Sequence, residues 1–95
     1  MAMKPFDRLL ATARAEIGYI EKETNAHLDD KTANAGDGNW NKYARDLDAL
    51  GVVYNSKKNG YAWCDIFTDW CFIQTFGLEL GLQLLCQAKK GVGAG

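Results

Sequence analysis

The stretch NGYAWCDIFTDWCF, residues 59–72, holds the strongest candidate in the chain for covalent chemistry, the thiol of Cys64. A second Trp-Cys pair follows seven residues later, at Cys71. A cysteine attacks a carbonyl only as the thiolate, and an unassisted thiol is mostly protonated near neutral pH. The start of a helix favours the anion because its first N–H groups have no partners within the helix. The sequence predicts that Cys64 occupies such a start, where the turn-forming residues 55–60 give way to an apolar helix.

The aromatic residues just before the cysteine are candidates for contacting a substrate. Tyr61 and Trp63 would form an apolar wall beside the thiol. Trp40 and Trp70 are expected instead on helices with matching apolar stripes, where tryptophan more often belongs to the core. We therefore predict substrate contacts for Tyr61 and Trp63 only.

A packing role is the main competing interpretation of Cys64, because free cysteine is among the most buried side chains. Asp65 and Asp69 also count against easy activation, since negative charge that faces a thiol raises its pKa. Cys71 and Cys86 are expected to be inert packing residues.

The rest of the chain offers little for a base or a disulfide framework. Its single histidine, His27, lies upstream in a polar loop and is interpreted as a solvated residue rather than as a catalytic base. Three cysteines are an odd number, and no C-x-x-C motif occurs, so neither a disulfide framework nor a zinc site is predicted.

An Asp/Asn-rich segment resembles a calcium loop only in part. Asp37, Asn39, Asn41 and Asp48 fall at positions 1, 3, 5 and 12 of an EF-hand-like template, but Lys42 stands where that loop requires glycine. These residues are equally suited to capping and covering a helix. We therefore predict no metal and no cofactor.

Bulk properties exclude several classes of protein. A chain of 95 residues forms one domain at most, and 47% hydrophobic with 24% charged residues is a globular composition. A net charge of −1 with scattered lysines and arginines argues against nucleic acid as a partner. No apolar run approaches the ~20 residues that span a bilayer, and the N-terminal sequence lacks a signal-peptide pattern, so we expect cytoplasmic synthesis and no membrane partner.

Hydrophobic periodicity predicts a mainly helical chain. The first predicted helix has Pro5 at its first position and Ile17 on its apolar stripe, and the second begins at an Asn39 cap and ends at Gly51. The predicted elements are a helix over 6–17, a long polar loop over 24–39, a helix over 40–50, a short extended piece over 52–54, a buried helix over about 63–76 and a helix over 77–86.

The segment GYAWCDIFTDWCF (60–72), together with GNWNKY (38–43) upstream, resembles the active-site region of the CHAP and NlpC/P60-like cysteine peptidases that cut peptidoglycan. The variants that it resembles occur in endolysins of bacteriophages and prophages, and the similarity spans about residues 6–95. It implies an α+β, papain-like fold. Residues 1–95 would then be a single partial domain, the N-terminal and mostly α-helical part that carries the nucleophile-bearing helix, with the catalytic sheet largely missing.

The resemblance implies that Cys64 is the nucleophile of a cysteine amidase or endopeptidase. Such an enzyme cleaves an amide bond of the cell-wall stem peptide, or its muramoyl link, once it is released to the bacterial peptidoglycan. No histidine follows Cys64 in the chain, so we expect a truncated domain that is inactive or weak by itself. We also expect it to self-associate through uncovered apolar surface. The alternative is a non-catalytic small helical module for binding or structure, with buried thiols.

Overall fold

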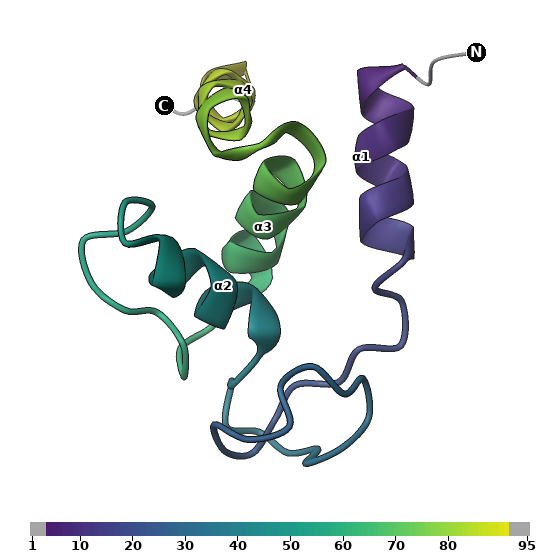
Figure 1. Cartoon of the computed structure of the whole chain (residues 1–95), viewed down its shortest axis with the longest axis vertical. Helices are drawn as coiled ribbons and strands as arrows, with labels where there is room; N and C mark the ends of the chain where they lie inside the picture. Colours follow the sequence, from purple (N-terminus) through teal and green to yellow (C-terminus); the bar gives the residue numbers. More distant parts are fainter. Residues whose placement is uncertain (1–3, 92–95) are drawn as a thin grey trace. The chain divides into compact units, whose positions relative to one another are not determined.

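The computed structural model describes residues 4–91, and within them the chain forms four α-helices (Figure 1). They are α1 (Pro5–Arg14), α2 (Lys42–Leu50), α3 (Cys64–Phe76) and α4 (Leu78–Gly91). No strand occurs among residues 4–91; the only β-type pairings there are isolated bridges of Lys22 with Ala35 and with Trp40. No helix of this part of the chain is both long and apolar enough for a membrane span.

The absence of a strand from residues 4–91 contradicts the expected α+β, papain-like fold. Residues 52–54, the predicted extended piece, form bends and make no β-bridge to another described segment. Residues 78–84, where leucines alternate as in a strand, belong to α4, because leucine, glutamate and glutamine favour a helix and no residue there is β-branched.

The chain divides into two compact units, which are described separately. One comprises residues 17–70, with α2 and the first half of α3; the other contains α1, the second half of α3 and α4. In the first unit, the Tyr43 ring is the centre of an aromatic cluster. Its centroid lies within 4.8–5.6 Å of the ring centroids of Tyr19, Trp63, Phe67 and Trp70.

Helix α2 begins two residues later than the sequence predicts. Asn41, rather than Asn39, is the N-cap, and its side chain accepts a hydrogen bond from the Ala44 N–H at 2.8 Å. Asn39 adopts a positive φ of 61°, and the backbone of Trp40 pairs with that of Lys22. Trp40 therefore lies before the helix instead of on its apolar face.

The polar loop over 24–39 is held by its own hydrogen bonds. The Glu23 N–H donates to the Asn34 carbonyl at 2.8 Å. The Asn34 side-chain amide donates in turn to both oxygens of Thr24 and to the Ala26 carbonyl. A Cβ at Gly38 would overlap the Glu23 carbonyl, so only glycine fits at that close approach. The conformation of the loop is thus defined by hydrogen bonds and by a close backbone contact within this unit.

The second unit packs α1 against the end of α3. The Arg8 guanidinium donates to the Thr75 carbonyl at 2.9 Å and lies 5.3 Å from the centroid of the Phe76 ring. Helix α1 ends at Arg14, three residues earlier than predicted, and Ile17 is 74% exposed rather than part of the apolar stripe. An open apolar hollow of about 400 Å³ remains in this unit, lined by Pro5, Phe6, Leu9, Phe72, Phe76, Leu84 and Gln87.

Candidate functional site

Cys64 is exposed and is the first residue of α3, the position that the sequence predicts for it. The carbonyl of Trp63 accepts the N–H of Phe67 at 2.9 Å, which makes Trp63 the last residue before the helix. The N–H groups of the first three helical residues, 64–66, therefore have no acceptor within α3. They contribute the positive end of the dipole of a helix of 13 residues.

The two predicted substrate-contacting residues have different surroundings. Trp63 belongs to the aromatic cluster: its ring stacks on Tyr43 at 5.6 Å and 20°, and meets Tyr19 edge-on at 6.4 Å. Tyr61 is 65% exposed. A substrate contact remains a prediction for both residues, but only Tyr61 is mostly exposed to solvent.

The acidic residues that follow Cys64 on α3 are placed near Tyr54. Asp69 is buried, and its Oδ2 accepts a hydrogen bond from the Tyr54 hydroxyl at 2.5 Å. Burial of Tyr54 and this hydrogen bond raise the pKa of the phenol well above its ordinary value, with a smaller contribution from the charge of Asp65. The carboxylate of Asp69 is thus hydrogen-bonded to the hydroxyl of Tyr54.

The other two cysteines differ from Cys64 in position, and all three are free thiols. Cys71 is only 4% exposed; burial, with a smaller contribution from the Glu16 carboxylate, raises the pKa of its thiol to about 11. Cys71 is therefore protonated at neutral pH and has the character of a packing residue. Cys86 is exposed on α4 and so is not the buried packing residue that the sequence predicts.

His27 lies in the polar loop with an exposed side chain and a positive φ of 56°. Its carbonyl accepts the Asp30 N–H at 3.2 Å, a contact that stabilises the loop. Within residues 4–91, no hydrogen bond joins His27 to Cys64. The described part of the chain therefore brings no imidazole into contact with the candidate nucleophile.

Two residues of the calcium-like template hold a turn against α2. Both carboxylate oxygens of Asp48 accept the Lys58 N–H at 2.9 and 3.0 Å, and one of them also accepts the Asn59 N–H at 3.0 Å. The Asn59 side chain in turn accepts the Asn41 N–H at 3.0 Å. Among the residues that the structure describes, no cluster of three or more His, Cys, Asp and Glu side chains could hold a metal ion.

The 17–70 unit contains an open groove of about 700 Å³, here called the aromatic groove. It is lined by Asn25, Trp40, Arg45, Asp48, Ala49, Lys57, Asn59 and Tyr61. Sequence reasoning missed it because Trp40 was assigned to the buried face of a helix over 40–50. The sequence does contain a signal for the observed arrangement. Asn41 is also a favourable N-cap residue, and a helix that begins after Asn41 leaves Trp40 outside it.

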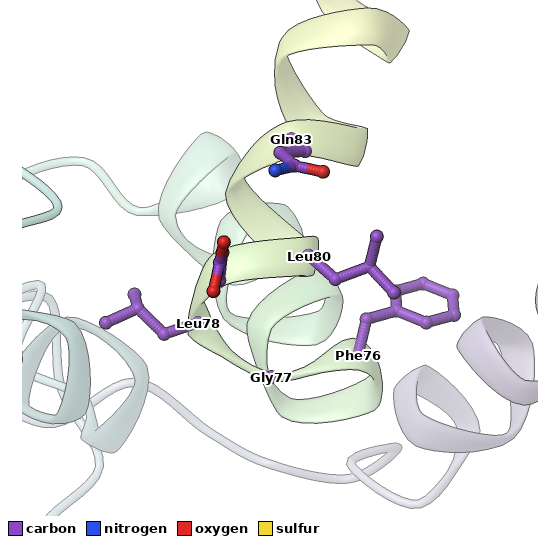
Figure 2. Close-up of a pocket in the computed structure, with 6 residues that line it drawn as sticks. Phe76, Gly77, Leu78, Leu80 and Gln83 are labelled. Carbon is purple, nitrogen blue, oxygen red and sulfur yellow. The ribbon is translucent and has the colours of Figure 1, made fainter.

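A second hollow, of about 460 Å³, lies at the corner between α3 and α4. Figure 2 shows Phe76 and Leu80 side by side, with Leu78 directed to the opposite side and Gln83 one turn further along α4. Glu79 is its only ionisable lining residue, and no thiol or imidazole lines it. This corner therefore offers no nucleophile.

Comparison of the chain with models of known protein families, with curated proteins and with solved structures finds no match.

Proposed function

We propose that Cys64 is the nucleophile of a thiol-dependent amidase or endopeptidase that acts on bacterial peptidoglycan. The observation that carries this proposal is an exposed thiol on the first residue of a helix of 13 residues. The similarity of residues 60–72 to the active-site segment of the CHAP and NlpC/P60-like cysteine peptidases supports the choice of substrate. The enzyme is made in the cytoplasm and acts after release to the cell wall.

The reaction follows from the chemistry of a thiolate at a helix start. The sulfur of Cys64 adds to the carbonyl carbon of the amide, the C–N bond breaks, and the amine leaves with a proton from the general acid. Water then hydrolyses the thioester, which releases the carboxylate and restores the thiol. The N–H groups of residues 64–66, which have no acceptor within α3, present partial positive charge at the start of the helix, where the sulfur reacts.

The base in this proposal is an imidazole other than that of His27. His27 makes no hydrogen bond to Cys64 within residues 4–91, and the sequence has no other histidine. A thiol without a base still ionises in part near neutral pH, but it lacks a donor for the leaving amine. The 95 residues alone are therefore weak or inactive in the proposed reaction.

The test uses the complete product of the gene that encodes this chain, incubated with purified bacterial cell walls. New free amino groups and the loss of turbidity are followed for the unmodified protein and for Cys64→Ala. Cys71→Ala and Cys86→Ala are the matched controls, because each removes one thiol elsewhere. We expect loss of activity in Cys64→Ala alone; equal release of amino groups by Cys64→Ala would end the proposal.

A non-catalytic module with packed thiols is the second candidate, and one observation favours it: the described residues bring no base to Cys64. Cys71 has the burial that this alternative requires, whereas Cys64 does not. A module of this kind would release no amino groups from cell walls, and Cys64→Ala would leave its fold unchanged.

A further inference from the structure

The unit that contains α1, the second half of α3 and α4 leaves a continuous set of apolar side chains uncovered, here called the apolar face. Every residue that lines the hollow of about 400 Å³ in this unit is apolar except Gln87. Phe76 lines both this hollow and the corner hollow between α3 and α4, so the two are continuous, and Figure 2 shows Leu80 beside it. A contiguous apolar surface, unlike a single exposed residue, marks an interaction site. The apolar face consists of Pro5, Phe6, Leu9, Phe72, Phe76, Leu80 and Leu84.

The apolar face combines a projecting ring with a hollow. Phe6, in the first turn of α1, is 67% exposed and lies at the edge of the larger hollow. The hollow has room for a phenyl ring of another molecule. A two-fold rotation brings the same face of two copies together, so each copy can place its Phe6 in the hollow of the other. The shape of the face is therefore suited to a second copy of the chain.

Two opposite charges border the apolar face at Phe76. The Arg8 guanidinium lies 5.3 Å from the centroid of the Phe76 ring, and Glu79 lines the corner hollow together with Phe76. Both side chains are exposed, and neither makes an ion pair with another residue within 4–91. Asp7, the acidic residue next to Arg8, lines neither hollow. A two-fold axis between the two charges would bring Arg8 of each copy to Glu79 of the other, so the border is complementary to itself.

We propose that the apolar face is the interface of a homodimer with two-fold symmetry. The buried apolar side chains supply the affinity, and the two ion pairs between Arg8 and Glu79 set the orientation, because exposed ion pairs contribute little to affinity. The sequence predicts self-association without a location, and the proposal assigns it to this face. It does not depend on the proposed function, because Cys64 belongs to the 17–70 unit and the apolar face does not.

The first experiment is analytical ultracentrifugation of the chain from about 5 to 500 µM in reducing buffer, so that the exposed thiols cannot cross-link. We expect a monomer–dimer equilibrium with a Kd of about 10–100 µM, the range of a small, transient interface. Phe6→Ser should weaken it at least tenfold, on the order of a lost central ring. Ile17→Ser is the matched control, because Ile17 is 74% exposed but belongs to the other unit; its dimerisation should be unchanged. Circular dichroism checks that each variant is folded.

The second experiment reverses the charges. Arg8→Glu and Glu79→Arg should each weaken dimerisation by about tenfold, because each variant brings like charges together at both ion-pair positions. An equimolar mixture of the two variants should form the dimer again, since a mixed pair has opposite charges at both positions. Arg8 also donates to the Thr75 carbonyl, so Arg8→Glu can lose stability for that reason. Glu79→Gln covers this case: it should weaken dimerisation less than Glu79→Arg, which adds repulsion.

Three results would overturn the proposal. The first is a chain that stays monomeric up to about 500 µM, which would leave the apolar face to a different partner. The second is dimerisation with the same Kd in Phe6→Ser, which would place the interface elsewhere. The third is equal dimerisation of Glu79→Arg and Glu79→Gln together with a mixture of charge-reversed variants that associates no better than either variant alone.

Discussion

The two Trp-Cys pairs, one at the start of α3 and one in its middle, have the same residue types but opposite environments. Cys64 is exposed at the first residue of the helix, whereas Cys71 is 4% exposed and its thiol pKa is raised to about 11. The tryptophans differ as well: Trp63 is half-buried, while Trp70 is 6% exposed and its indole N–H donates to Asp46 at 3.0 Å. The pair at the helix start, Trp63 and Cys64, is therefore the candidate reactive pair, whereas Trp70 and Cys71 pack in the core.

The difference shows that one Trp-Cys motif can place its thiol either in solvent or in the core, depending on its position along the helix. At the helix start, the thiol is exposed to solvent and lies beside N–H groups that have no acceptor within the helix. Seven residues further on, burial removes the solvent and penalises the anion. A repeated Trp-Cys pattern in a sequence therefore predicts two roles rather than two equivalent sites.

The largest expected effect is on amide cleavage in cell walls. Cys64→Ala in the complete gene product should reduce the rate of amino-group release by about three orders of magnitude or more, because it removes the sulfur on which the proposed thioester forms. Cys71→Ala should retain most of the rate. Similar losses in both variants would remove the functional distinction between the two pairs.

The second expected effect is on stability and concerns the tryptophans. Trp70→Ala should lower the free energy of unfolding by about 3–5 kcal/mol, because it removes a buried ring and leaves Asp46 without its indole donor. Trp63→Ala should cost clearly less, since Trp63 is only half-buried. Urea unfolding followed by circular dichroism measures both values. An equal loss of unfolding free energy in the two variants would mean that both tryptophans contribute equally to the core, which would contradict the comparison.

The sequence predicts the helical parts of this comparison well, because they depend on local signals. The start of α3 follows from the change from turn residues to apolar periodicity, and Gly51 ends α2 with a φ of 72° as its residue type predicts. The aromatic groove was not predictable in the same way. It depends on which of two nearby asparagines caps α2 and on a turn that Asp48 holds from ten residues away.

The α+β, papain-like fold was wrong for the described residues because it rested on a resemblance in short segments rather than on strand signals in the chain. A motif around one cysteine specifies a helix and the turn before it, but strands require partners elsewhere in the chain. Residues 52–54 have only a short apolar run among turn residues and find no partner. The proposed role of Cys64 depends on the local helix start and is independent of that fold.

The third expected effect is a pH dependence that belongs to Cys71. Its thiol has an ordinary pKa of 9.0 and a raised value of about 11 in the folded protein. The unfolded chain therefore loses this proton first, so the stability present below pH 9 decreases as the pH rises from about 9 to 11. Thermal unfolding at several pH values should show this decrease, and Cys71→Ala should make it smaller. The same slope in Cys71→Ala would assign the effect to other groups.

The smallest expected effect is the cost of removing each sulfur. Cys71→Ala should destabilise the protein by about 1 kcal/mol through loss of buried packing, whereas Cys64→Ala should stay within about 0.5 kcal/mol of the unmodified protein. Chemical unfolding of the two variants under identical conditions measures the difference. A larger cost for Cys64→Ala would mean that this thiol packs in the core.

The most direct measurement is alkylation of the folded protein with iodoacetamide at increasing pH, read by mass spectrometry of each cysteine peptide. Cys86→Ser serves as the background, so that only the two cysteines of α3 remain. We predict that Cys64 is alkylated in the folded state while Cys71 reacts only after the protein unfolds. Protection of Cys64 equal to that of Cys71 would contradict the placement of an accessible nucleophile at the start of α3.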